Sequence, residues 1–249
     1  MTPSPLADAE FVACPPDGRR VVRGRRVRLG DVTASGRLRL DALARYLQDV
    51  ASDDVDEAGI ERPWVLRRSV LRFGDLPRFR DDIELATFCS GTGGRLAERR
   101  TVVSVGSEVA IDVAAIWVYV DEEGRPARLE DWFFDVYGSA AKGRSVRGRL
   151  QHAAPGPDVD ARSWPLRRAD VDVLAHVNNA IAWAAVEDVL GTELDGRRLV
   201  GAEVEYRAAI DVGDPVTLAV ARGPDRLACW MMVGDDVRTS MIVHLAPPP

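Results

Sequence analysis

One short polar stretch, from Asp170 to Asn179, carries the residue types that chemistry requires. It reads Asp-Val-Asp-Val-Leu-Ala-His-Val-Asn-Asn, so two acids, a histidine and two amides stand close together in the chain. Carboxylates and imidazoles act as general acids and bases when their surroundings suit them. Any site chemistry in this chain is therefore expected here.

The apolar run behind this stretch predicts how it is positioned. Ala180–Leu190 is rich in alanine and is followed by Gly191, which favours a buried helix with a glycine as its C′ residue. Either Asn178 or Asn179 is suited to the N-cap, because an amide oxygen accepts from the free N–H groups of the first turn. Those donors and the helix dipole stabilise an oxyanion held nearby.

The first half of the chain reads as a strand and a helix followed by four strands. Between residues 38 and 58, apolar residues recur at spacings of three and four, which predicts one apolar stripe on a helix. Alternating or β-branched runs predict strands at residues 21–29, 64–73, 82–89, 96–105 and 109–120. The pattern indicates an antiparallel sheet with a helix packed on it.

The second half repeats this order. A short strand at 164–168 leads into the polar stretch and its helix, and strands follow at 199–208, 215–221, 227–233 and 238–245. Asp31 corresponds to Asp170 and Asp49 to Asp188, both at an offset of 139 residues. A tandem duplication explains the shared order and offset better than chance does.

The duplication sets the predicted domain boundaries. Residues 1–20 are Pro-rich and form a loose N-terminus, 21–134 the first repeat, 135–162 a linker and 163–249 the second repeat. The linker contains glycines, prolines and basic residues with little periodicity. Each repeat has one apolar sheet face and a single helix and is too small to be stable alone, so the two sheets are expected to pack edge to edge around both helices.

Composition excludes several classes of protein. The chain has 249 residues and is 46% hydrophobic, yet no run approaches the roughly 18 apolar residues of a membrane span. Acidic residues in the first ten positions do not fit a signal peptide, so a cytoplasmic protein is expected. The three cysteines lie far apart and indicate neither a disulfide framework nor a zinc site. A net charge of −6 argues against general nucleic-acid binding.

The polar stretch resembles a known motif. Asp-Val-Asp-x-x-x-His-Val-Asn-Asn is similar to Asp-x-Asp-x-Asn-x-His-Val-Asn-Asn of the acyl-acyl-carrier-protein thioesterases, which are double hot-dog proteins. Looser matches follow in the same order at Tyr46–Ala51, Trp64–Arg68, Ile116–Val120 and Glu205–Arg207. The resemblance implies an α+β fold, a tandem (double) hot-dog in which two antiparallel sheets each wrap on a central helix, with an acyl chain in a groove between the halves.

The resemblance also assigns roles to the polar stretch. Asp172 and His176 would be the catalytic pair that directs a water at the thioester carbonyl, and Asn178 and Asn179 would bind substrate or shape the turn. The first repeat has Thr33 and Arg37 at the positions matching this pair, so the site would be single. No metal or cofactor is implied. The partner would be an acyl-loaded acyl carrier protein. Hydrolysis of its thioester would release a free fatty acid in fatty acid biosynthesis.

Two departures from the family motif keep alternatives open. The family's middle asparagine is Leu174 here, and a family glutamate followed by cysteine corresponds to Ala209 and Ile210. An acid late on the first helix could replace the missing catalytic groups, with Asp49, Asp53 and Asp54 as candidates. An acidic, solvated helix end is the more common explanation of such a cluster. The chain would otherwise be an acyl-CoA thioesterase, or a degraded hot-dog protein that binds acyl thioesters without cleaving them.

A hot-dog hydratase is disfavoured, because no Asn-Pro precedes His176. The remaining histidines, His152 and His244, are expected on the surface, and Trp117 and Trp183 are expected in the core. Trp183 could also line a pocket.

Overall fold

The computed structural model describes residues 11–60, 62–157, 159–191 and 197–247, and it divides the chain into two compact units. The first unit contains the described residues up to Leu38 together with Tyr46–Leu150. The second contains Arg39–Arg45 and the described residues from Gln151 onward. Residues 1–10 of the predicted loose terminus lie outside the described part of the chain.

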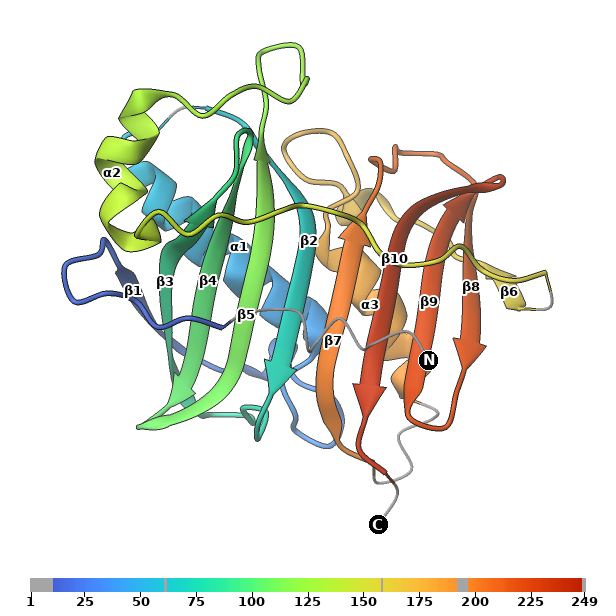
Figure 1. The fold of residues 1–249 in the computed structure, drawn as a ribbon. Helices are drawn as coiled ribbons and strands as arrows, with labels where there is room; N and C mark the ends of the chain where they lie inside the picture. Colours follow the sequence, from blue (N-terminus) through green and yellow to red (C-terminus); the bar gives the residue numbers. More distant parts are fainter. Residues whose placement is uncertain (1–10, 61, 158, 192–196, 248–249) are drawn as a thin grey trace. The chain divides into compact units, whose positions relative to one another are not determined.

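The first unit is an antiparallel sheet with most of a long helix on one face (Figure 1). Its strands are β1 (Val21–Arg26), β2 (Trp64–Phe73), β3 (Asp82–Thr92), β4 (Leu96–Val105) and β5 (Glu108–Tyr119), in the spatial order β1-β3-β4-β5-β2. Helix α1 (Leu40–Glu57) precedes β2. The predicted helix and strands are confirmed, with ends shifted by at most three residues.

A second helix in this unit was not predicted. Helix α2 (Asp131–Ala141) begins before the predicted linker and runs into it, and it packs beside β3. Its buried side chains are Phe133, Tyr137, Ala140 and Ala141, which are spaced as one helical face requires. Lys142 adopts a left-handed conformation (φ 46°, ψ 34°) and ends the helix. The assignment of residues 135–141 to an irregular linker was therefore wrong.

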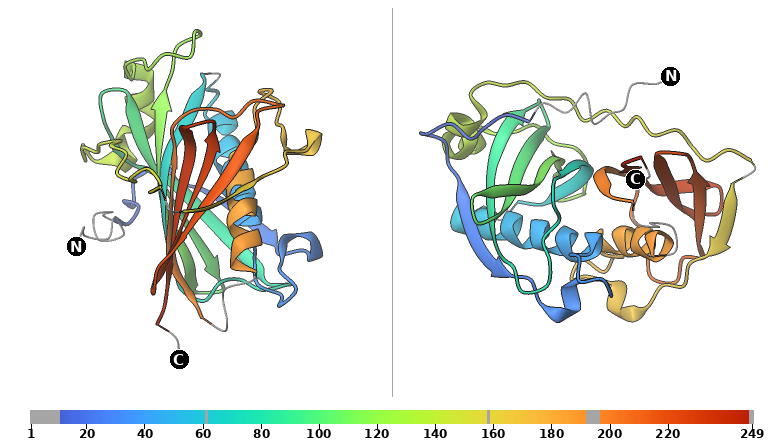
Figure 2. Two further views of the ribbon diagram at one scale, coloured as in Figure 1. Left: turned by 90° about the vertical axis from the view of Figure 1, so that its right-hand side faces the viewer. Right: turned by 90° about the horizontal axis from the view of Figure 1, so that it is seen from below.

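The second unit repeats the arrangement with a shorter helix. Its strands are β6 (Asp160–Ser163), β7 (Leu199–Tyr206), β8 (Val216–Arg222), β9 (Arg226–Val233) and β10 (Asp236–Leu245), in the order β7-β10-β9-β8-β6 and antiparallel throughout. Helix α3 (Ala180–Leu190) lies along one face of this sheet, as α1 does in the first unit (Figure 2). The α+β class and the two hot-dog repeats are confirmed.

The first strand of the second unit lies earlier than predicted. The sequence placed it at 164–168, whereas β6 pairs with β8 from Asp160 to Ser163. The Trp164 N–H still donates to the Val216 oxygen at 2.8 Å, but Pro165 has no N–H to continue the ladder. The pairing therefore ends there, and a 3₁₀ turn, η3 (Arg168–Asp170), follows.

The segment that follows α2 crosses the sheet face opposite the helix in each unit. In the first unit Thr92 bridges Ser145, and in the second the Trp230 indole N–H donates to the Ala153 oxygen at 2.9 Å (Figure 1). Both faces of strand β7 are buried in consequence. Among the described residues, none of the helices is both long and apolar enough to cross a membrane.

Candidate functional site

The polar stretch folds into a tight turn immediately before α3. The Asp172 N–H donates to the His176 oxygen at 3.0 Å, and the Ala175 N–H donates to the Asp172 oxygen at 3.0 Å. Ala175 takes the left-handed conformation, with φ 63°, which non-glycine residues seldom adopt. The turn therefore holds the backbones of Asp172 and His176 together at a cost in backbone strain.

The Asp172 carboxylate is half-buried and is bonded within this turn. Its Oδ1 accepts from the Leu174 N–H at 3.0 Å, and its Oδ2 accepts from the Asn178 side-chain amide at 3.3 Å. A carboxylate oxygen has two lone pairs, so both oxygens keep capacity for one more donor. Asp172 and Asn178 are thus brought together directly, and the carboxylate is oriented before any substrate binds.

His176 lies at the exposed end of the turn. Its side chain is 51% exposed, and its Nε2 lies 3.8 Å from Oδ1 of Asp211. The Val177 N–H donates to the Ile210 oxygen at 2.9 Å, which places the segment after β7 alongside the turn. The positions that match the family's glutamate and cysteine, Ala209 and Ile210, are therefore neighbours of the motif, and the acid nearest the histidine there is Asp211.

The two asparagines at the start of α3 have different roles. Asn178 Oδ1 accepts from the Ala180 N–H at 2.9 Å, whereas Asn179 has helical dihedrals (φ −54°, ψ −27°) and makes no side-chain cap bond. Asn178 is therefore the capping residue. At the other end Gly191 is right-handed (φ −56°), so its expected role as a left-handed C′ residue was wrong.

Leu174, the main departure from the family motif, does not contribute to a pocket. Its side chain is 71% exposed, and its neighbour Val173 is fully exposed. The leucine therefore neither blocks nor lines a substrate site within the second unit.

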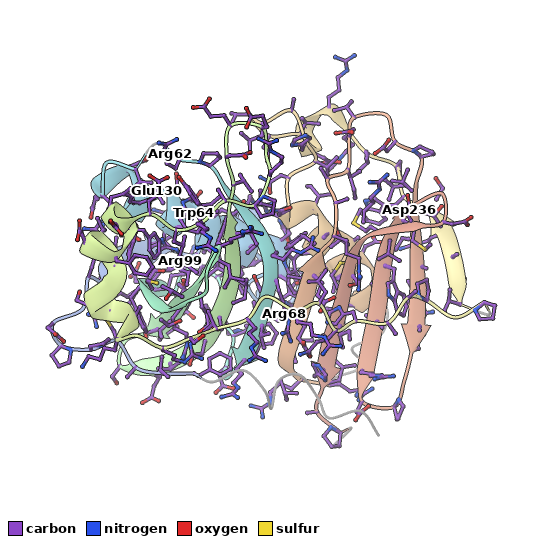
Figure 3. The ribbon with its side chains drawn as sticks, turned by 45° about the horizontal axis from the view of Figure 1, so that its top comes forward. Arg62, Trp64, Arg68, Arg99, Glu130 and Asp236 are labelled. Carbon is purple, nitrogen blue, oxygen red and sulfur yellow. The ribbon has the colours of Figure 1, made fainter. Side chains whose placement is uncertain are left out.

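The first unit contains a partly open cavity that the sequence did not reveal. Its volume is about 240 Å³, and it lies between α1, strands β2 to β5 and α2. The walls are mainly aromatic and aliphatic: Ala51, Val55, Ile60, Trp64, Cys89, Ala97, Trp117, Phe133 and Tyr137. Gln48, Ser52, Arg62, Glu98 and Arg99 supply its polar lining, and Figure 3 shows Arg62, Trp64 and Arg99 gathered at this end of the unit.

The aromatic side chains of the cavity pack on one another. Trp64 contacts Tyr119 and Phe133 at ring-centroid distances of 5.3 and 5.4 Å, and Phe133 contacts Tyr137 at 5.0 Å. Tilted aromatic pairs of this kind hold each other in place. Trp117 was expected in the core and is half-buried in the cavity wall. Packed aromatic rings therefore form one part of the cavity wall.

A buried carboxylate contacts two residues of the cavity wall. Asp54, on α1, is 1% exposed and accepts from Arg19 Nε at 2.8 Å, Arg99 Nη1 at 2.7 Å and the Tyr137 hydroxyl at 3.1 Å. Asp49 and Asp53 instead form solvated ion pairs with Arg25 and Arg23. Of the three acids considered on this helix, only Asp54 is buried.

Burial changes the acidity of two cavity groups. Desolvation, with a further contribution from the Asp54 charge, raises the pKa of the Tyr137 phenol to about 12. Desolvation likewise raises the pKa of the Cys89 thiol to about 11. At neutral pH both groups are protonated, so Cys89 is not an activated nucleophile.

The histidine expected on the surface of the linker is buried. His152 is 7% exposed; its Nδ1 lies 2.9 Å from the Ser240 hydroxyl and its Nε2 lies 3.6 Å from the Glu203 carboxylate. His244 Nε2 lies 3.2 Å from the other oxygen of Glu203, and its side chain is 17% exposed. Both surface assignments were wrong, because the segment after α2 covers this sheet face and buries the acids of β7.

The described part of the chain contains no group of three or more His, Cys, Asp or Glu side chains arranged to hold a metal ion. The chemistry considered below uses the protein's own side chains.

Family models match both repeats. The model of the acyl-ACP thioesterase N-terminal domain matches residues 22–137, and that of the acyl-ACP thioesterase C-terminal domain matches residues 157–238. An uncharacterized protein of Mycobacterium tuberculosis, present in strains CDC 1551 and H37Rv, is 28% identical over 241 residues. That alignment covers 95% of this chain and 96% of the relative.

Solved structures share the fold over nearly the whole chain. A putative oleoyl thioesterase from Lactobacillus plantarum aligns with a TM-score of 0.80 at 18% identity, covering 94% of this chain and 98% of its own. The 12:0-ACP thioesterase from Umbellularia californica aligns with a TM-score of 0.79 at 17% identity, covering 92% and 98%. At these identities the likeness is one of fold.

Proposed function

Because the chain belongs to the acyl-ACP thioesterase family and is by that membership a thioester hydrolase, we propose that it hydrolyses fatty acyl thioesters of acyl carrier protein. The products are a free fatty acid and the carrier thiol, so the reaction ends chain elongation in fatty acid biosynthesis. A cytoplasmic location, expected from the sequence, belongs to the same proposal.

The observation that carries this proposal is the cavity of the first unit. It is concave, partly open and mainly apolar, and those are the properties of a site that binds a hydrocarbon chain. Removing an acyl chain from water into such a space supplies binding free energy of about 25 cal/mol per Å² of apolar surface. We assign the acyl chain to this cavity. The hydrolytic residues are proposed separately, from the chemistry of the turn before α3.

The turn supplies a simple chemical scheme. His176 accepts a proton from a water whose oxygen attacks the thioester carbonyl, and Asp211, beside its Nε2, stabilises the imidazolium that forms. Asp172, fixed by Leu174 and Asn178, orients the same water. The proton passes to the departing sulfur as the carbon–sulfur bond breaks. Thioesters are activated, so an oriented water suffices.

The test is release of free thiol from long- and medium-chain acyl-carrier-protein and acyl-CoA substrates. We expect His176→Ala and Asp172→Ala each to lower kcat/KM by about 10²-fold or more. Val173→Ala is the matched control, because Val173 lies in the same turn with its side chain fully exposed. If both site variants are folded by circular dichroism and hydrolyse the substrates at the wild-type rate, this turn takes no part in the reaction.

Binding without cleavage is the second candidate, and the exposed Leu174 and Ala209 favour it. The family positions they occupy provide neither a donor nor a carboxylate here. This candidate predicts that acyl thioesters quench tryptophan fluorescence with no thiol released. The same substrate panel separates acyl carrier protein from coenzyme A as the carrier.

A further inference from the structure

The cavity of the first unit is not uniformly apolar, and its polar lining includes the guanidinium-bearing side chain of Arg99. The Arg99 side chain is 14% exposed and lines the cavity from strand β4. It stands among apolar and aromatic neighbours that include Cys89, Phe133 and Tyr137. A saturated acyl chain would pass a charged group in a site otherwise suited to hydrocarbon.

The Arg99 guanidinium has more donors than its bonds to Asp54 and Thr87 use. A guanidinium has five N–H donors. The bonds of Arg99 to Asp54 at 2.7 Å and to the Thr87 hydroxyl at 3.2 Å both use Nη1. Even with the nearby Tyr137 hydroxyl as a further neighbour, donors remain on its other nitrogens. A saturated acyl chain packed against these N–H groups would remove them from water without offering them an acceptor.

The charges around Arg99 are balanced, and this selects the kind of acceptor. Asp54 pairs with both Arg99 and Arg19, and Arg19 also lies 3.9 Å from Glu57. Arg23 pairs in turn with Glu57 and Asp53, so three arginines face three carboxylates in this network. Within it a further buried carboxylate would find no uncompensated positive charge, and Arg62, the other arginine of the lining, is exposed. A neutral oxygen accepts from the Arg99 guanidinium without adding charge.

We propose that Arg99 selects acyl groups that carry a neutral oxygen, a hydroxyl or a ketone, on the chain away from the thioester. Arg99 then determines specificity through its bond to that oxygen, and the aromatic walls position the chain. This inference rests on the proposed function, since it names the acyl class that the same cavity receives. The reaction at the thioester is unchanged.

The test compares kcat/KM for a saturated medium-chain acyl thioester and for its hydroxy- and oxo-substituted counterparts of equal length, with oxygen at successive carbons. We expect the wild type to prefer an oxygenated chain by about tenfold or more. Arg99→Met, which keeps an unbranched side chain of similar length, is expected to abolish the preference, so that kcat/KM becomes equal for the saturated and the oxygenated chain.

Arg100→Met is the matched control. Arg100 is the next residue of β4, is also buried, and forms an ion pair with Asp112, but it does not line the cavity. Its loss is expected to leave the substrate preference unchanged, which separates the effect of cavity contact from that of breaking a buried ion pair.

Two outcomes overturn the inference. One is a wild-type enzyme that hydrolyses saturated and oxygenated chains equally, a measurement that needs no folded variant. The other is an Arg99→Met variant that slows both substrates by the same factor. Failure of the proposed function looks different, because then the wild type releases thiol from none of the substrates.

Discussion

At the scale of single residues, aspartates of one chain differ in role because their surroundings differ. Asp53 is 44% exposed and pairs with Arg23 in solvent, where such a pair contributes little to stability. Its neighbour Asp54 is buried and accepts from three donors, so the same functional group there is fixed within the core. Asp172 is intermediate: half-buried, bonded within a turn, and still open to a further donor.

The raised pKa of the Tyr137 phenol predicts a loss of stability at alkaline pH. Its pKa is raised from 10.0 to about 12 in the folded protein, so between these values the unfolded chain loses a proton that the folded chain keeps. The free energy of unfolding therefore falls as pH rises from about 10 to about 12, and is unaffected by this group below pH 10. Urea unfolding of the wild type and Tyr137→Phe across this range measures the effect.

The variant serves as the control for other groups. Cys89 shifts in the same direction, so both proteins should lose some stability above about pH 9. The decline between pH 10 and 12 should be shallower in Tyr137→Phe. If the free energy of unfolding falls equally with pH in both proteins, the pKa of the Tyr137 phenol is not raised in the folded state.

At the scale of elements, α3 begins at the polar turn, so the cap of the helix and the orientation of Asp172 depend on one residue. Asn178 accepts from the Ala180 N–H through Oδ1 and donates to Asp172 through Nδ2. One amide thus satisfies a free N–H of the first helical turn and fixes the neighbouring carboxylate.

Replacing this cap should affect both stability and activity. Asn178→Ala is expected to lower the free energy of unfolding by about 1 kcal/mol. Asn179→Ala is the matched control and should cost less, because the Asn179 side chain makes no cap bond and its backbone oxygen keeps the Tyr206 hydroxyl bond. Denaturant titrations of both variants test this. Equal losses would assign the cap to neither asparagine.

At the scale of the whole molecule, the duplication extends to individual hydrogen bonds. The turn Thr33–Arg37 is closed by an N–H···O bond of 2.8 Å, and the corresponding turn Asp172–His176 by one of 3.0 Å. The third residue after Thr33 is Gly36, with φ 83°, and the residue that corresponds to it is Ala175, with φ 63°. The same left-handed position thus holds glycine in one repeat and alanine in the other.

This internal comparison predicts a stabilising substitution. Ala175→Gly should raise the free energy of unfolding by about 1 kcal/mol, because glycine adopts the left-handed conformation without the penalty that a Cβ imposes. Gly36→Ala should lower it by a similar amount. A destabilised Ala175→Gly variant would mean that the Ala175 side chain makes contacts worth more than the strain.

The sequence by itself determined the elements and their duplication. Hydrophobic periodicity and turn residues act over a few positions, so most strands, α1 and α3 could be assigned without tertiary information. The motif from Asp170 to Asn179 identified the turn before α3 in the same way. Helix α2 was missed because its apolar face is short and lies beside a segment rich in glycine and basic residues.

Only the tertiary structure decided which groups work together. The cavity draws its walls from residues between Gln48 and Tyr137 on six elements and the loops between them, and no local pattern marks such a set. Asp54 differs from Asp53 only because the helix turns one side chain inward, and Asp211 reaches His176 only because the segment after β7 runs beside the turn. Burial and charge pairing are long-range properties, and they decide what each polar residue does.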